Sequence, residues 1–263
     1  MFPRQFLAVF LLAAPAVLAQ ALPELGEPAQ AALTPLQERL LGQSIMKEAR
    51  RDPGYYDDAE ATDYLTRVGN RLAAHGGDAR QSFEFFLMKD PQINAFALPG
   101  GKVGVYTGLL KLAENDDELA TVMGHEIGHA VARHGAERMT EAALIAGVGA
   151  VGAAVAEKKY GAQTSDLFAI AYGGGTTLVH VLPHSRHNES EADKMGMVFA
   201  AKAGYDPRAA VKFWTKMQAE SAKKKSQLPT FLSTHPSDEK RVAEIQAYLP
   251  QVIPVYEANR NRG

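Results

Sequence analysis

The chain has 263 residues, 46% of them hydrophobic, and a formal net charge of −2. This composition suits one globular domain with a substantial core and offers no basic excess for nucleic acid. The chain contains no cysteine. Disulfide bonds, thiolate nucleophiles and sulfur ligands are therefore excluded, and any bound metal must be held by histidine and carboxylate side chains.

The first 21 residues have the features of a secretory signal peptide. Arg4 precedes an apolar run from Phe6 to Leu18, and the small residues that follow predict cleavage after residue 19 or 21. The run is short for a membrane span, and an uncleaved anchor is the alternative. We therefore expect a periplasmic protein in which residues 22–33, rich in proline and alanine, form a linker.

The next part of the chain predicts two helices followed by a small sheet. Thr34 and Pro35 are typical of a helix start, and a change to closely spaced aromatic residues after Ser82 is typical of strands. We predict helices at 34–51 and 59–74, and strands at 83–87, 93–98 and 102–106, the last two joined at residues 99–101. The predicted fold class is α+β and mainly helical.

One segment of this sheet is a candidate for binding an extended peptide. Asn94, Ala95, Phe96 and Ala97 lie shortly before the chain's strongest chemical motif. An exposed edge strand can bind a peptide by adding it to the sheet. The alternative is an interior strand of a small sheet.

That motif is His125-Glu126-Ile127-Gly128-His129. Asn115, followed three residues later by Glu118, is typical of a helix start, so the motif is expected within a helix. His125 and His129 then lie on one face and can hold one metal ion, while Glu126 lies beside the open position as a base. The alternative is two histidines that are merely hydrogen bonded on a helix face.

A helix expected from His187 to Ala203, ended by Gly204, carries candidates for a third ligand. Glu189 and Asp193 are four residues apart and share a face, whereas Glu191 points elsewhere. We predict that one of the pair binds the metal and favour Glu189, with Asp193 accepting the second N–H of a ligand histidine. An ordinary acidic helix start is the alternative.

Other segments have less specific patterns. Residues 142–156 predict an apolar helix that packs on the core or lies at a membrane surface, and residues 161–177 suggest a flexible flap. A helix is expected after Asp206, with an inner face formed by Val211, Phe213, Trp214 and Met217. A loop at 221–236 then leads to a last helix from Ser237 to about Leu249.

Several of these motifs together resemble peptidase family M48, which includes proteases of the HtpX, BepA, LoiP and Oma1 types. The matching segments are residues 94–101, 105–109, 125–129, 189–193 and 233–237. The resemblance covers residues 34–250 and implies a gluzincin-type fold, metalloendopeptidase activity and one Zn²⁺ per chain, held by His125, His129 and Glu189. Residues 251–263 are expected to be a C-terminal tail.

The chain departs from some members of that family. It shows neither the long membrane helices of the HtpX type, nor the lipid-bearing cysteine of the LoiP type, nor the helical repeats of the BepA type. We therefore expect a compact single-domain member. Partners that relatives recruit through those parts are not assumed.

Peptide hydrolysis at such a site needs a base and a donor for the oxyanion. Glu126 is the predicted base, and His235 is the first candidate for the donor, followed by Arg186. His235 is equally a candidate to occupy the open position of the metal and hold the enzyme inactive, and a surface position is a further alternative. The remaining histidines near the motifs, expected beside the site or on the surface, are His134, His180, His184 and His187.

Two functions follow from these expectations. The first is a zinc metalloendopeptidase that hydrolyses unfolded or misassembled cell-envelope proteins, with peripheral membrane association as an option; its quality-control role rests on the resemblance alone. The alternative is a latched, chaperone-like protein that binds such clients with low protease activity. A purely structural zinc site is disfavoured because Glu126 would be superfluous there.

Overall fold

The computed structural model describes residues 33–76, 82–145, 184–223, 230–236 and 239–261. The helices are α1 (Pro35–Ala49), α2 (Ala59–Ala73), α3 (Thr107–Leu112), α4 (Asp116–Val131), α5 (His134–Ile145), α8 (Arg186–Lys202), α9 (Ala209–Lys223), α10 (Thr230–Thr234) and α11 (Glu239–Asn259). The strands are β1 (Glu84–Met88), β2 (Ala95–Leu98) and β3 (Lys102–Tyr106). The predicted α+β, mainly helical class is confirmed.

The sheet has the order β1-β3-β2, so β2 lies at an edge. β1 pairs with β3 in parallel, and β2 pairs with β3 as an antiparallel hairpin. The hairpin turns at Gly100 and Gly101, whose φ values of 75° and 77° fall in the region that side chains disfavour. The turn therefore depends on the glycine pair that the sequence places between the two strands.

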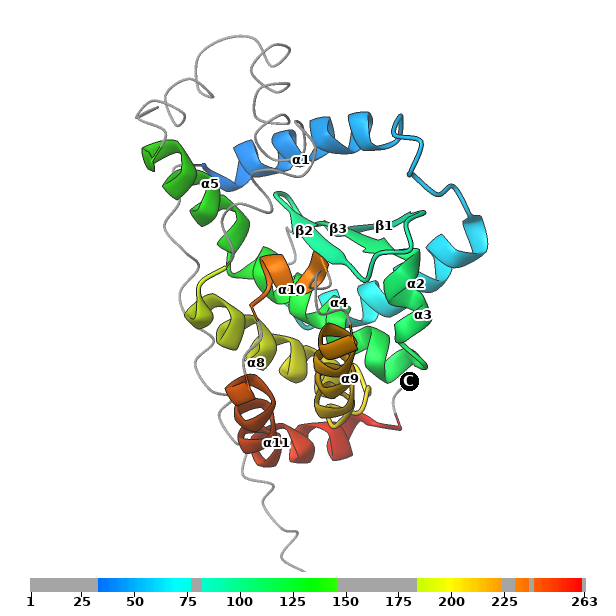
Figure 1. Ribbon diagram of the computed structural model, residues 1–263, viewed down its shortest axis with the longest axis vertical. Coiled ribbons are helices and arrows are strands. Elements are labelled where there is room, and N and C mark those ends of the chain that lie inside the picture. Colours follow the sequence, from blue (N-terminus) through cyan, green and yellow to red (C-terminus); the bar gives the residue numbers. More distant parts are fainter. Residues whose placement is uncertain (1–32, 77–81, 146–183, 224–229, 237–238, 262–263) are drawn as a thin grey trace, which may run out of the picture.

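Each face of the sheet packs against its own set of helices, because successive side chains of a strand point to opposite faces. Phe86 and Met88 of β1 join a cluster with Ile45 and Met46 of α1. Their neighbours in β1 join the larger core formed with α2, α4, α8, α9 and α11. Figure 1 shows α1 running across one side of the sheet, with α4 on the other side.

Helix α4 lies at the centre of the larger core. Leu119, Val122, Met123 and Ile127 are at most 1% exposed. Helices α2, α8 and α9 all contact it, and α11 packs along α8. Because the helix is surrounded, any polar side chain on its inner turns must find its partners inside the protein.

The last helix is longer than predicted. α11 continues past Leu249 to Asn259 although Pro250 and Pro254 lie inside it. A proline in a helix removes a backbone hydrogen bond, which normally favours an end. Here Val252 is fully buried and the following turn also packs on the core, so tertiary contacts offset that loss. Much of the expected C-terminal tail is therefore helix.

One further prediction needs correction, because the predicted loop before Pro236 contains the short helix α10. The helix that carries the motif ends at Val131, and α5 starts at His134 after Arg133, which has a positive φ of 62°. The signal peptide, most of the linker, His180, the flap and most of the 142–156 stretch lie outside the described residues.

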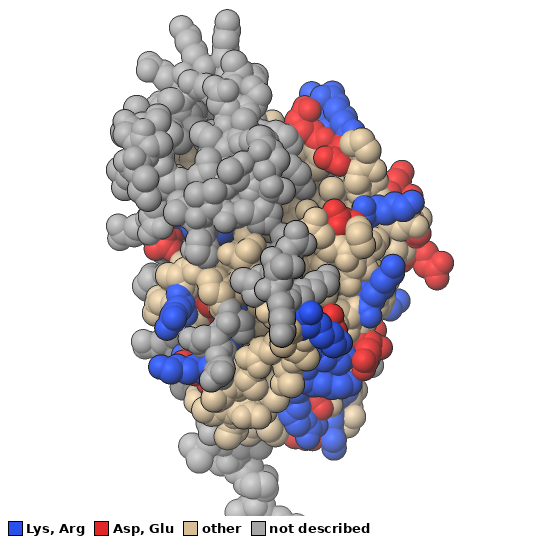
Figure 2. Space-filling view, viewed as in Figure 1, with Lys and Arg blue, Asp and Glu red and all other residues tan. Residues whose placement is uncertain are grey.

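The surface carries charges of both signs. Figure 2 shows basic and acidic side chains interspersed over the described part of one face. Among the described residues, no helix is both long and apolar enough to cross a membrane.

Candidate metal centre

Helix α4 presents His125, Glu126 and His129 inside the protein, where each is at most 2% exposed. The helix starts as predicted, because the Asn115 side chain accepts a hydrogen bond from the Glu118 backbone N–H at 2.9 Å. The helical spacing places the two imidazoles one turn apart, with ring centroids separated by 4.5 Å.

A close crossing of α4 and α8 brings these side chains to the first turns of α8. A methyl group on Gly196 would lie 2.8 Å from both the Gly124 carbonyl carbon and the His125 backbone nitrogen. A methyl group on Gly128 would lie 3.0 Å from the carbonyl oxygen of Ala192. Two helices can approach this closely only where side chains are absent from the contact.

Four ligand atoms converge at the crossing. The Nε2 atoms of His125 and His129 are 3.0 Å apart, and the Glu189 carboxylate lies 3.5 Å from the first and 3.2 Å from the second. Nδ1 of His235 lies 3.2 Å from His125 Nε2 and 3.0 Å from Glu189 Oε1. All four atoms lie within 4.8 Å of one another, as a shared metal ion requires.

These separations fit a tetrahedral ion. Zinc bonds of about 2.0–2.1 Å in tetrahedral geometry separate neighbouring ligand atoms by about 3.3–3.4 Å. Five of the six residue pairs have separations of 3.0–3.5 Å, and the sixth, His129 with His235, lies within 4.8 Å. A set of three imidazoles and one carboxylate is also the donor chemistry that zinc accepts. The described residues therefore fit a zinc ion.

On the far side of His125 lies an ionic cluster. His125 Nδ1 is 2.9 Å from Asp193 Oδ1. The guanidinium of Arg241 donates to both oxygens of Asp193 at 2.8 Å and to Glu189 Oε2 at 2.8 Å. It also lies 3.4 Å from the ring centroid of Trp214. Asp193 thus orients His125, and Arg241 orients both carboxylates.

The charges of this cluster support one another. Burial alone would lower the pKa of His125, but Glu189 and Asp193 outweigh it and raise the pKa to about 9. Burial raises the pKa of Asp193, but Arg241 and His125 outweigh it, so the net pKa lies below its usual value. The pKa of Glu189 is likewise lowered, because His235 and His125 outweigh burial. Both carboxylates are therefore ionised and suit a bound cation.

His129 has a different environment. Its Nδ1 lies 2.9 Å from Nδ1 of His134, the first residue of α5. Nε2 of His134 lies 3.3 Å from Glu191 Oε2. The ring of His184 stacks on His129 with centroids 4.0 Å apart and an interplanar angle of 25°.

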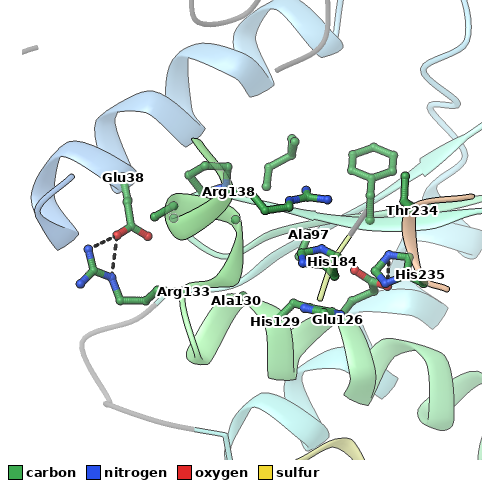
Figure 3. A pocket seen from close by; sticks show the side chains of 16 residues that line it. Glu38, Ala97, Glu126, His129, Ala130, Arg133, Arg138, His184, Thr234 and His235 are labelled. Atoms are coloured by element: carbon green, nitrogen blue, oxygen red, sulfur yellow. Dashed lines mark hydrogen bonds and ion pairs between the residues drawn. The ribbon is translucent and has the colours of Figure 1, made fainter. Parts of the chain in front are cut away.

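Glu126 faces a cavity beside the ligands (Figure 3). Both of its carboxylate oxygens are buried and have no hydrogen-bond partner among the described residues. Nε2 of His235 lies 3.5 Å from Glu126 Oε1. The residues that line this cavity include Phe96, Ala97 and Leu98 of β2. The edge strand and the unpartnered carboxylate thus share one hollow.

The structure places the predicted residues unevenly. His125, His129, Glu189 and His235 converge, and Asp193 contacts His125. Glu191, expected to point elsewhere, contacts His134. Arg186 and His187, in contrast, are exposed in the first turn of α8.

The arginine that contacts Glu189 is Arg241, which sequence reasoning missed. A signal for it exists: Arg241 lies four and seven residues before Ile245 and Tyr248, which form the buried stripe of α11.

Comparison with known proteins agrees with the geometry. Residues 59–249 match the model of peptidase family M48. The chain is 35% identical to the mitochondrial metalloendopeptidase OMA1 of Schizosaccharomyces pombe, over 81% of this chain and 61% of that protein. It is 32% identical to the β-barrel assembly-enhancing protease of Escherichia coli K12, over 90% of this chain and 49% of that protein.

A third relative, the mitochondrial metalloendopeptidase OMA1 of Arabidopsis thaliana, is 41% identical over 61% of this chain and 30% of that protein. The chain thus spans about half the length of the bacterial and yeast relatives. The match to the family model covers the sheet, α4 and α8, and therefore includes the three candidate ligands His125, His129 and Glu189. The chain belongs to peptidase family M48.

Proposed function

We propose that this protein is a zinc-dependent metalloendopeptidase. The observation that carries the proposal is the buried Glu126 carboxylate, which has no hydrogen-bond partner among the described residues and lies next to the converging ligand atoms. An unpartnered buried carboxylate is unfavourable unless a reacting group supplies the missing contact. His125, His129 and Glu189 would hold the ion.

The chemistry divides between the ion and the chain. When bound, zinc acts as a Lewis acid that makes a water molecule more acidic and polarises a carbonyl. Glu126 accepts the proton of the attacking water on its carboxylate and passes it to the leaving amine. Asp193 accepts the Nδ1–H of His125, so that the ring, once it has lost its Nε2 proton, presents the Nε2 lone pair to the ligand set.

The edge strand β2 supports an endopeptidase. β3 pairs with one edge of β2. Just before β2, the carbonyl oxygen of Ile93 accepts a hydrogen bond from the backbone N–H of Phe231 in α10 at 3.2 Å. Ala97 and Leu98 line the cavity that also contains Glu126. A peptide added alongside Asn94, Ala95, Phe96 and Ala97 would pass the catalytic carboxylate in extended form.

We propose unfolded or misassembled proteins of the cell envelope as substrates. An extended peptide can reach β2 only where the client is not folded, and one relative is named for enhancing β-barrel assembly. The expected signal peptide would place the mature protein in the periplasm, and residues 142–156 could add contact with a membrane surface.

A second candidate function follows from His235. Its Nδ1 lies among the ligand atoms at 3.0–3.2 Å, where it would complete a four-ligand set. A closed set leaves no position for water, which is typical of structural rather than catalytic zinc. In this state the protein would bind clients with little hydrolysis, and movement of His235 would open the site.

One experiment tests the peptidase. Purified mature protein should contain one zinc per chain and cleave unfolded casein. Glu126→Gln, which keeps the size of the side chain and the metal ligands, should lower kcat by at least about a hundredfold with zinc retained. Unchanged cleavage by this variant would show that Glu126 is not the base.

His235→Ala separates the two roles of this residue. If His235 closes the site, the variant should cleave casein faster than the wild type. If His235 donates to the oxyanion, the variant should lose activity with zinc still bound.

A further inference from the structure

Two residues near His129, His134 and Glu191, have no role in the proposed mechanism. His134 Nδ1 and His129 Nδ1 are 2.9 Å apart, a distance at which one of the two atoms can donate a hydrogen bond to the other. Glu191 Oε2 lies 3.3 Å from the other nitrogen of His134. His134 is only 2% exposed, so water does not compete freely for these contacts.

The direction of both hydrogen bonds follows if His129 binds the metal through Nε2. If His129 Nε2 keeps its lone pair for an ion, the proton of the neutral ring must be on Nδ1. Nδ1 of His129 then donates to Nδ1 of His134. His134 consequently carries its own proton on Nε2 and donates it to the carboxylate of Glu191.

We propose that His134 and Glu191 form a positioning pair, which holds His129 in the tautomer and ring orientation that bind the metal. This inference rests on the proposed metallopeptidase function and deepens it. The pair acts through His129 and contacts neither the metal nor the substrate.

The contacts around His134 show that its position is built into the fold. Arg133, the preceding residue, has a φ of 62° and donates hydrogen bonds to Glu38 of α1 and to the Leu33 carbonyl oxygen. One turn into α5, Glu137 accepts a hydrogen bond from Asn188 of α8 at 2.9 Å. His134 is therefore anchored to both α1 and α8.

The remaining neighbour of the ring does not offer the same support. His184 stacks on the face of His129 with an interplanar angle of 25°. A stacked ring restrains tilt, but it cannot accept the in-plane N–H of the ring below it. The in-plane contact at Nδ1 is the one that His134 supplies.

Three variants test the pair by zinc affinity rather than by activity. His134→Phe keeps a ring of similar size but removes the acceptor, His134→Asn retains an acceptor near the Nδ1 position, and Glu191→Gln removes only the charge. We expect the zinc dissociation constant of His134→Phe to rise by about 10–100-fold, with smaller increases for the other two. Competition with a chromophoric chelator measures this constant.

A spectroscopic signature distinguishes orientation from bulk stability. In zinc-loaded wild type labelled with ¹⁵N-histidine, His129 should show the Nδ1–H tautomer, and His134 the Nε2–H tautomer. In Glu191→Gln the His134 signal should shift or mix with the other tautomer. Zinc-free melting temperatures of the variants show whether any loss of affinity comes from unfolding.

His187→Asn and Glu244→Gln are matched controls, because both residues are exposed and lie outside the centre. Both variants should bind zinc as the wild type does. If the zinc dissociation constant of folded His134→Phe is within about threefold of the wild-type value, the proposed positioning pair is wrong. The proposal is also wrong if His129 of the wild type carries its proton on Nε2. If the wild type itself neither binds zinc nor cleaves casein, the proposed function fails first.

Discussion

His125 and His129 lie one helical turn apart, yet the protein holds them in different ways. His125 contacts a carboxylate directly, and that carboxylate is clamped by the buried Arg241. His129 contacts the imidazole of His134, which in turn contacts the carboxylate of Glu191. The Glu191 side chain is 18% exposed. The first support is ionic and faces the core, whereas the second is reached through a neutral ring and faces α5.

This difference predicts whether a substitution lowers folding stability or metal affinity. A buried ionic cluster must keep every partner, because a single charge left in the core is strongly unfavourable. When the His134 contact is broken, the carboxylate left behind is Glu191, whose side chain is 18% exposed and keeps contact with solvent. Changes on the His125 side should therefore reduce folding stability, while changes on the His129 side should mainly reduce metal affinity.

The largest expected effect is on the His125 side. Arg241→Met would leave Asp193 and Glu189 in the core without their arginine, and we expect the free energy of unfolding to fall by about 3–5 kcal/mol. Urea denaturation of the zinc-free protein measures it. Arg208→Met is the control, because the Arg208–Asp206 pair is exposed; the control should unfold as the wild type does. Equal stability of the two variants would remove the proposed asymmetry.

Removing the metal tests both supports together. At a free zinc concentration of a thousand times the dissociation constant, binding stabilises the folded state by about 4 kcal/mol. Chelation should therefore lower the melting temperature of the wild type and, by the same amount, of Glu126→Gln, which keeps the ligands. Trp214, the only tryptophan of the chain, lies 5.7 Å from the His125 ring and reports unfolding by fluorescence. A melting temperature that does not change on chelation would contradict the proposed zinc centre.

The helix crossing carries both supports, so widening it should weaken both. Gly196→Ala places a methyl group 2.8 Å from the backbone of α4, and we expect a loss of about 1–3 kcal/mol together with weaker zinc binding. Gly135→Ala is the matched control, since nothing lies within 4 Å of its added methyl group. Thermal unfolding and chelator competition compare the two. A Gly196→Ala protein as stable as the control would show that α8 can move without consequence.

The smallest expected effect concerns a carboxylate of α4 outside the centre. Burial raises the pKa of Glu118, but hydrogen bonds from the Glu114 amide, Lys216 and Lys212 outweigh it and lower the pKa. A lowered folded-state pKa stabilises the protein above the unfolded value of about 4.3, and that stability is lost as the pH falls through the folded value. Glu118→Gln should therefore be less stable at pH 7, with the difference shrinking in acid.

Urea titrations of both proteins between pH 7 and pH 3 measure that difference. A gap that widens as the pH falls would reverse the sign and contradict the pairing of Glu118 with the lysines. The result also gives the background for the metal centre, because it shows what an ionised carboxylate of α4 contributes without a ligand histidine.

Local signals were sufficient for most of the elements. The Thr34 cap with Pro35, the Asn115 cap and the Gly204 stop each act within a few residues, so they can be recognised without knowing the fold. The i, i+4 spacing of His125 and His129 likewise follows from helical geometry alone. The proximity of Glu189 was an inference from chemistry, because a catalytic zinc ion takes three protein ligands and a chain without cysteine must supply them from histidine and carboxylate side chains.

The tertiary structure decided what joins segments that are distant in sequence. Arg241 meets Asp193 and Glu189 only because α11 packs along α8, and Gly196 lies against Gly124 only because α4 and α8 cross in contact. Packing also carried α11 past Pro250, against its local preference. Sequence patterns report the preferences of each segment, whereas the partners of a buried charge depend on how the segments pack. The sequence by itself determined that two histidines and a glutamate lie together on one helix, and the tertiary structure decided how each histidine is held.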